Sequence, residues 1–140
     1  MNVRDIMSTD VSWVDPSAKL KDIARVMKDK DVGSVPVVQN NMVKGIITDR
    51  DIVIRVISEG KDTNQVTADQ VMSADPVVIE ESESIDKAAD IMFEYQIKRL
   101  PVVKNDKLVG IISLGDLAVE SIHIDEAGEA LSGISRGIAH

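Results

Sequence analysis

The hydrophobic residues between positions 17 and 30 recur at spacings of three and four. The charged residues of this stretch lie largely off the apolar stripe, as in an amphipathic α-helix. Proline disfavours helix in the residue before it, so Asp15-Pro16 sets a boundary, and the Ser17 hydroxyl can cap a helix that follows. The pattern predicts a helix that begins near Ser17 and ends near Gly33. Its apolar stripe consists of Leu20, Ile23, Ala24 and Met27.

Two short apolar runs follow this helix, at residues 35–38 and 42–48. Asn40-Asn41 separates them, and asparagine tolerates the positive φ of a tight turn, so the pattern predicts a β-hairpin. Pro36 falls near the start of its strand, where a missing N–H donor matters least. A second helix is expected to begin near Asp49 and to stop at Glu59-Gly60. With an extended segment at residues 11–14, the order is strand, helix, strand, strand, helix.

The same order of elements occurs a second time. Shifting the sequence by 65 positions aligns it with itself without a gap, which marks an internal duplication. The second copy has an extended segment at 76–79, a helix capped by Ser82, a hairpin at 100–103 and 107–112, and a closing helix from about 114. Its helix has the apolar stripe Ile85, Ala88, Ala89 and Met92. Aligned identities include Met7-Ser8 with Met72-Ser73, Gly45-Ile46-Ile47 with Gly110-Ile111-Ile112, and Asp51 with Asp116.

The duplication predicts an α+β protein with repeats at residues 1–60 and 68–124, a polar linker at 61–67 and a tail at 125–140. A unit of about 60 residues is marginal alone, so we expect the two repeats to share a core about a pseudo-twofold axis. In the tail, Ala130, Leu131 and Ile134 form a short apolar face, which suggests a docking segment.

Composition narrows the function. The chain has 140 residues, a net charge of -8, 2% aromatic residues and no cysteine. The acidic charge and scarce aromatics oppose nucleic-acid binding, and the absence of cysteine removes disulfides and thiolate chemistry. No apolar run approaches the roughly 18 residues of a membrane span, and the N-terminus has no signal-peptide pattern. We therefore expect a cytoplasmic protein.

Each repeat places a hydroxyl and a carboxylate where its third strand runs into its second helix. The pairs are Thr48 with Asp51 and Ser113 with Asp116. One reading is helix capping, in which the hydroxyl accepts an amide hydrogen and the aspartate lies in the first turn. The other is a nucleoside site, in which the carboxylate accepts the hydrogens of a ribose diol. The spacing alone does not decide between them.

The doubled pattern of Pro-Val-Val, Gly-Ile-Ile and then Thr-Asp-Arg-Asp-Ile or Ser-Leu-Gly-Asp-Leu resembles the cystathionine-β-synthase (CBS) domain, present as a tandem pair over residues 1–124. The resemblance implies two βαββα repeats packed through their sheets. It implies an adenosyl ligand in the clefts between them: AMP, ADP, ATP, NAD or S-adenosylmethionine. It also implies a disc-like homodimer that acts as a sensor for an effector protein, which the sequence leaves unidentified.

The resemblance also implies residue roles. Thr48 and Asp51 would hold ribose or phosphate in one cleft, and Ser113 and Asp116 in the other. The base would contact the first extended segment and the segment before the hairpin of each repeat. These are Ser12 with Val32, Ser34, Val35 and Pro36, and Val77 with Ile97, Arg99, Leu100 and Pro101. Plain core packing is the alternative for Val32, Val35, Ile97 and Leu100. For Trp13 we expect burial rather than stacking on a base.

The cations differ between the repeats, so we expect two unequal sites. Arg50 and Arg99 are the expected phosphate ligands, with Arg55 and Arg136 in reserve, and a solvated surface charge is the alternative for each. The catalytic inventory is thin: the histidines are His123 and His140, and the stretch 123–126 offers possible metal ligands without further support. We expect a non-enzyme with no required cofactor and no metal. The competing class is a protein-interaction module that binds no small molecule.

Overall fold

The computed structural model describes residues 1–121 of the chain, which form two compact units. One unit comprises Ser12–Pro76 with Asp106–Leu108, and we call it the α1 unit. The other comprises Met1–Val11, Val77–Asn105 and the chain from Val109 onward, and we call it the α4 unit. The division does not follow the sequence repeats, because the first eleven residues join the unit built mainly from the second repeat.

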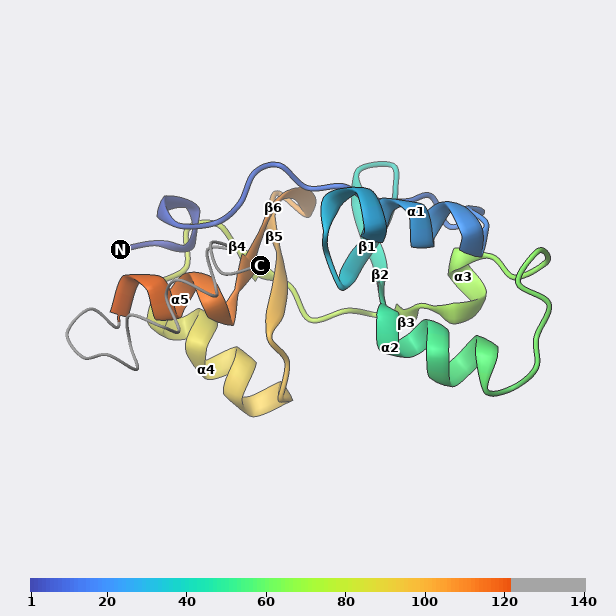
Figure 1. The fold of residues 1–140 in the computed structure, drawn as a ribbon. Helices are drawn as coiled ribbons and strands as arrows, with labels where there is room; N and C mark the ends of the chain where they lie inside the picture. Colours follow the sequence, from blue (N-terminus) through green and yellow to red (C-terminus); the bar gives the residue numbers. More distant parts are fainter. Residues whose placement is uncertain (122–140) are drawn as a thin grey trace. The chain divides into compact units, whose positions relative to one another are not determined.

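The α1 unit contains a hairpin with helices, as the sequence predicts (Figure 1). The β1 and β2 strands are antiparallel, and Asn40 and Asn41 form the turn with φ of 55° and 65°. The predicted start of the second helix at Asp49 is confirmed, but its continuation is a π-helix, which the pattern did not indicate. The elements are α1 (Leu20–Lys30), β1 (Ser34–Gln39), β2 (Met42–Thr48), α2 (Asp49–Ile52), η2 (Val53–Ile57), α3 (Ala68–Val71) and β3 (Ser73–Ala74).

The α4 unit repeats this plan. Strand β4 runs parallel to β5, and β5 is the neighbour of β6, whose residues from Val109 onward belong to this unit. Asn105 and Asp106 form the second turn with φ of 52° and 66°, as in the first repeat. The elements are η1 (Val3–Asp5), β4 (Ile79–Glu80), α4 (Ile85–Tyr95), β5 (Arg99–Lys104), β6 (Lys107–Ser113) and α5 (Leu114–Ser121). The architecture is α+β, as expected.

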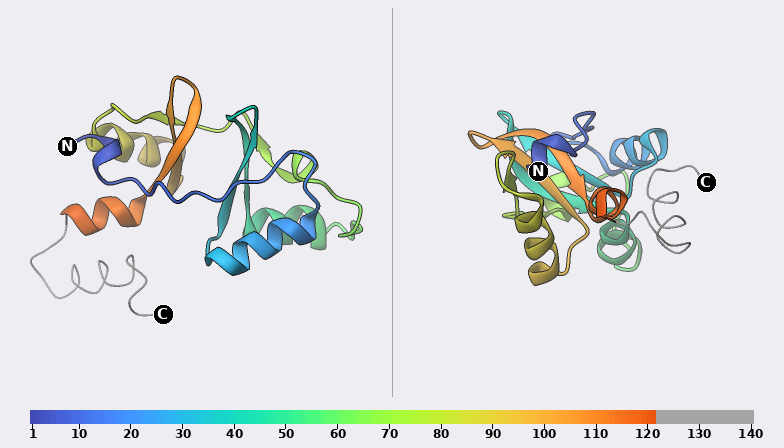
Figure 2. Two further views of the ribbon diagram at one scale, coloured as in Figure 1. Left: turned by 90° about the horizontal axis from the view of Figure 1, so that it is seen from above. Right: turned by 90° about the vertical axis from the view of Figure 1, so that its left-hand side faces the viewer.

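Each unit has a hydrophobic core that contains residues of both repeats. In the α1 unit, α1 and the α2–η2 segment lie on the same side of the hairpin (Figure 2). Buried side chains from these elements, the hairpin, the extended segment before α1 and the stretch from residue 66 through α3 form its core: Val14, Leu20, Ile23, Val35, Val37, Ile47, Val56, Val66, Ala68 and Val71. The core of the α4 unit consists of Val3, Ile79, Ala88, Met92, Leu100, Val102, Ile112 and Leu117.

An exchanged segment completes each core. Val3, at the start of the chain, is fully buried in the α4 unit, and its N–H donates to the Glu83 carbonyl over 2.8 Å. The repeat-equivalent bond joins the Ala68 N–H to the Ala18 carbonyl over 2.9 Å in the α1 unit. The first helical turn of each repeat thus packs in the unit built mainly from the other repeat. This exchange supplies apolar surface that a unit of about 60 residues lacks.

The short helices that carry this exchange were not predicted. In both, the N-cap backbone N–H donates to the side chain of the third helical residue, which is one half of a capping box. In α3 the Thr67 N–H donates to Gln70 Oε1 over 3.1 Å. Because Val66 is buried and its carbonyl accepts the Leu20 N–H, the stretch before α3 also folds against α1.

Three local expectations are wrong. Ser17 does not cap α1, because the helix begins only at Leu20 with Lys19 as its N-cap; the Ser17 N–H and hydroxyl donate to the Asp15 carboxylate over 3.0 and 2.6 Å. In the second repeat the cap is Ser84 instead of Ser82, and its hydroxyl accepts the Lys87 N–H. Ala24 and Ala89 are exposed, so neither small side chain belongs to the buried stripe. No helix within residues 1–121 is long and apolar enough to cross a bilayer.

Candidate functional site

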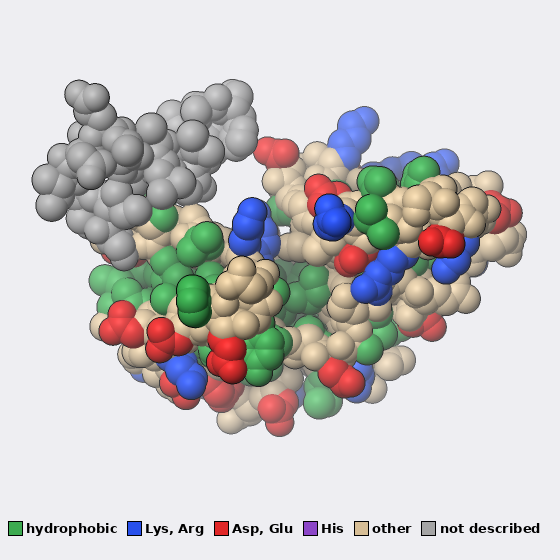
Figure 3. Space-filling view, turned by 90° about the horizontal axis from the view of Figure 1, so that it is seen from below, with side chains coloured by type: hydrophobic (Ala, Val, Ile, Leu, Met, Phe, Trp, Pro, Cys, Tyr) green, Lys and Arg blue, Asp and Glu red, His purple; other side chains and the backbone are tan. Residues whose placement is uncertain are grey.

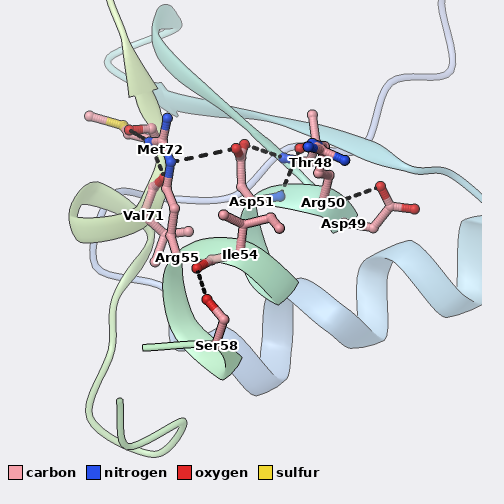
Figure 4. Close-up of polar contacts among 9 residues, drawn as sticks. All are labelled: Thr48, Asp49, Arg50, Asp51, Ile54, Arg55, Ser58, Val71 and Met72. Carbon is pink, nitrogen blue, oxygen red and sulfur yellow. Dashed lines mark hydrogen bonds and ion pairs between the residues drawn. The ribbon is translucent and has the colours of Figure 1, made fainter. Parts of the chain in front are cut away.

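The first candidate site lies where β2 ends and α2 begins. The Asp51 N–H donates to Thr48 Oγ1 over 3.0 Å, and the Thr48 N–H donates to Asp51 Oδ2 over 2.9 Å (Figure 4). These reciprocal bonds form a capping box that satisfies two backbone donors at the helix start. The capping interpretation of this motif is therefore confirmed.

The second repeat reproduces the arrangement at the junction of β6 and α5. The Asp116 N–H donates to Ser113 Oγ over 3.0 Å, and the Ser113 N–H donates to Asp116 Oδ2 over 2.9 Å. In both boxes the helix uses Oδ2 of the aspartate. Both aspartates are partly buried, so each carboxylate is held in one orientation at the positive end of a helical turn.

The α1 unit brings the other predicted residues of the first site close to this box. Ser34 in β1 is the register partner of Thr48, and the Asp49 N–H donates to the Gly33 carbonyl over 3.0 Å. The extended segment that contains Ser12 runs alongside β1, because the Val14 N–H donates to the Pro36 carbonyl over 3.0 Å. Three segments distant in sequence thus meet at one end of the hairpin.

The second site has the equivalent arrangement within the α4 unit. The Leu114 N–H donates to the Lys98 carbonyl over 2.8 Å, which places the segment before β5 beside the start of α5. Ile79 in β4 pairs with Val102 in β5, so the extended segment beginning at Val77 runs beside the same strand. The two junctions therefore share one backbone plan.

Burial separates the predicted base-contacting residues into two groups. Val35, Pro36, Leu100 and Pro101 are buried, with Val35 and Leu100 at 0% exposure in the two cores, so core packing describes their side chains. The remaining residues of this set lie nearer the surface. Ser12, Val32, Ser34, Val77 and Ile97 are partly buried, and Arg99 is exposed.

The expectation that Trp13 is buried is wrong. Its side chain is 51% exposed, although the neighbouring Val14 lies in the core. Val14 pairs with Val37, and successive side chains of an extended segment point to opposite sides, so the register that buries Val14 turns Trp13 outward.

The cations differ between the repeats, and the arginine that contacts Asp51 is Arg55 instead of the expected Arg50. Arg55 Nε lies 3.7 Å from Asp51 Oδ1, and Arg55 Nη1 donates to the Val71 carbonyl over 3.1 Å (Figure 4). Arg50 is exposed and contributes its backbone N–H to the Asp49 carboxylate over 2.8 Å. Arg136 and the 123–126 stretch lie outside the described residues, as do His140 and the apolar face of the tail.

Charged side chains away from the two junctions do not form a further binding site among the described residues. Lysine and arginine side chains stand among acidic and uncharged ones on the face drawn in Figure 3, without one continuous basic surface there. Among residues 1–121, no group of three or more histidine or acidic side chains is placed to hold a metal ion. The Ser17 hydroxyl and N–H, which bond Asp15, hold the pKa of that exposed carboxyl below its usual value.

Comparison with known proteins identifies the repeats. The family model of the CBS domain matches residues 3–58 and again residues 68–123. The chain is 40% identical to CBS domain-containing protein YhcV of Bacillus subtilis (strain 168) over 139 residues, which are 99% of each chain.

Two similar solved structures contain adenosyl ligands. The structure of CBSX2 in complex with AMP has a TM-score of 0.74 and 26% identity, over 86% of this chain and 95% of that one. The CBS domain pair of MJ0100, in complex with 5′-methylthioadenosine and S-adenosyl-L-methionine, has the same TM-score and identity over 84% and 93%. The family match and the duplicated fold agree, and the chain belongs to the CBS-domain family, with two CBS domains in tandem.

Proposed function

We propose that this chain is a regulatory module that binds an adenine nucleotide or a related adenosyl ligand at its two strand–helix junctions. Thr48 and Asp51 provide one site and Ser113 and Asp116 the other, and occupancy is passed to an effector protein. The chain itself carries no catalytic step in this proposal, and its proposed compartment is the cytoplasm.

The observation that carries the proposal is that the two oxygens of each carboxylate have different partners. The capping box uses only Oδ2, which fixes the carboxylate plane and leaves Oδ1 as an acceptor. A ribose diol presents two adjacent O–H donors, and a preoriented carboxylate accepts them without first losing side-chain freedom. Capping and ribose binding are therefore compatible uses of one aspartate.

The surroundings suit the rest of an adenosyl ligand. Backbone of the segments before β1 and β5 lies beside the helix starts, where N–H and C=O groups can bond a base edge. Partly buried Val32 and Ile97 offer apolar surface there. The AMP complex of CBSX2 and the adenosyl complexes of MJ0100 support this ligand class.

Thermal unfolding with AMP, ADP, ATP, NAD and S-adenosylmethionine tests the proposal. A ligand present at 1,000 times its Kd stabilises the folded state by about 4 kcal/mol, which raises Tm clearly. We expect a rise for at least one ligand and its loss in the Asp51→Ala/Asp116→Ala chain, measured against that variant's own unliganded Tm. No rise with any of the five would contradict the proposal.

A second candidate, a ligand-free interaction or dimerisation module, has one observation in its favour. The η2 helix exposes Val53, Ile54 and Ile57 by 55%, 47% and 60% of their surfaces. Adjacent exposed apolar side chains favour association, so we also propose a homodimer that uses this face. Sedimentation equilibrium of the chain and of Ile57→Glu tests it: we expect a dimer that the charge weakens. Dimers of equal strength in both would exclude this face.

A further inference from the structure

The guanidinium of Arg55 joins the first candidate site to a distant segment of the chain. Its Nε faces Asp51 Oδ1 at 3.7 Å, and its Nη1 donates to the carbonyls of Val71 and Met72 at 3.1 and 3.5 Å (Figure 4). The planar guanidinium has donors pointing in several directions, so one arginine can serve both a carboxylate and main-chain carbonyls. The Arg55 side chain is 49% exposed, and that of Asp51 is 18% exposed.

The segment that Arg55 holds is the one by which the chain leaves the α1 unit. After Met72, β3 pairs with Gly45 and Ile46 of β2, and the chain passes into the α4 unit after Pro76. We call residues 71–76 the exit segment. Val71 at its start is buried in the core, whereas Ser73, Ala74 and Asp75 are exposed, so the Arg55 bonds act where the segment passes from the core to the surface.

The second repeat lacks this connection. The residue 65 positions after Arg55 is Glu120, on α5, and the residues that correspond to Val71 and Met72 are Ile6 and Met7. A carboxylate cannot donate to main-chain carbonyls at neutral pH, and it repels a neighbouring aspartate. The connection therefore distinguishes two otherwise matched junctions. Capping alone does not require it, because Ser113 and Asp116 form the same box while no arginine among residues 1–121 pairs with Asp116.

We propose that Arg55 is a positioning residue that couples ligand occupancy at Asp51 to the exit segment. The inference rests on the proposed function. Asp51 Oδ2 is committed to the Thr48 N–H, so a ribose diol and the Arg55 guanidinium compete for Oδ1. When ribose takes Oδ1, the guanidinium loses its anionic partner and its hold on the Val71 and Met72 carbonyls weakens. Binding at the first site loosens the exit segment, whereas binding at Asp116 does not.

Linkage fixes the converse effect. If the ligand loosens the exit segment, then a loosened exit segment favours the ligand by the same factor. A partner protein that recognises the exit segment in only one of its two states, held by Arg55 or loosened, therefore responds to ligand occupancy at the first site. An exposed ion pair together with a side-chain to backbone bond is worth a factor of about three to ten in the opening equilibrium.

Hydrogen–deuterium exchange of peptides spanning residues 69–76 tests the coupling. The Asp116→Ala background confines AMP to the Asp51 site, and calorimetry on the same samples measures AMP binding independently. We expect saturating AMP to speed exchange in this peptide by about threefold to tenfold. In Arg55→Met on this background, exchange is already fast without AMP and does not rise further.

Two further variants keep the result interpretable. Glu120→Gln, the matched change in the other repeat, should leave the AMP effect intact. Arg55→Lys keeps the charge but not the forked donors, so it should lose the effect while remaining folded even where Arg55→Met does not. AMP that binds without speeding exchange, or that speeds it equally in Arg55→Lys, overturns the coupling alone. AMP that binds neither the parent chain nor the Asp116→Ala chain overturns the coupling and the AMP form of the proposed function together.

Discussion

Replacing Gly110 by alanine should destabilise the protein through a steric clash with an exchanged segment. A Cβ at this position would lie 2.7 Å from Met7 Sδ and 2.8 Å from the Ser8 carbonyl oxygen. The methionine can rotate, but the carbonyl cannot easily move. It accepts the Ile111 N–H over 2.9 Å, and the Ser8 N–H donates to the Ile111 carbonyl over 2.8 Å. Relief of the clash therefore requires the first segment to move away from β6.

We expect the free energy of unfolding of Gly110→Ala to fall by about 2 kcal/mol, the usual cost of overpacking a tightly fitted region. For a chain of this length, 1 kcal/mol changes Tm by roughly 4 °C, so the expected fall is roughly 8 °C. The repeat-equivalent Gly45→Ala should behave alike, since its Cβ would lie 2.5 Å from Met72 Sδ and 2.8 Å from the Ser73 carbonyl oxygen.

Calorimetric unfolding of both alanine variants provides the measurement, with Gly60→Ala as the control. Gly60 has φ of 67°, and no atom lies within 4 Å of the place that an alanine Cβ would take, so only its left-handed backbone opposes alanine. That cost is about 1 kcal/mol. If Gly110→Ala unfolds at the wild-type temperature, or falls no further than Gly60→Ala, then the first segment does not pack on β6 as described.

Three smaller effects follow from local contacts. Ser84→Ala removes the side-chain acceptor of the Lys87 N–H at the start of α4 and should cost about 1 kcal/mol in urea unfolding, whereas an unchanged midpoint would deny the cap. Because Trp13 is 51% exposed and the sole tryptophan, its emission should be red-shifted and readily quenched by acrylamide, and a blue-shifted, protected emission would place it in the core. Ser17→Ala should raise the pKa of Asp15 in an NMR titration, because both Ser17 bonds favour the ionised carboxylate. The stabilisation of the folded state by these bonds is present at neutral pH and is lost as pH falls through the lowered pKa.

Local sequence patterns predicted the elements but not how segments are exchanged. The period of the α1 and α4 stripes and the asparagine turns encode short-range geometry, and α1, α4 and both hairpins occur within a few residues of where these patterns place them. Met7 packing on Gly110 joins residues 103 positions apart, and no local pattern carries that information. The repeated Met-Ser and Gly-Ile-Ile motifs were the available signal, since each supplies one side of the close contact.

In the candidate sites, too, local spacing predicts some residues, whereas others depend on contacts between distant segments. Thr48 with Asp51 and Ser113 with Asp116 follow from spacing, because a capping box requires a hydroxyl and an acid three residues apart. The role of Arg55 does not follow, because its carbonyl partners are 16 and 17 residues away and approach only after α3 folds back. Ser17 failed as a cap because α1 begins three residues later, at Leu20 with Lys19 as its N-cap, while the Ser17 hydroxyl donates to Asp15.

The central claim is that each capping aspartate also binds ribose, and titration calorimetry of the Asp51→Asn/Asp116→Asn chain tests it most directly. Asparagine keeps an oxygen for the Thr48 or Ser113 N–H, so each change should cost only about 0.5 kcal/mol of stability through the lost charge at the helix start. Loss of a charged acceptor for a ribose diol should weaken binding of the ligand found by thermal unfolding at least about tenfold. A folded double-asparagine chain with wild-type affinity would show that these aspartates only cap their helices.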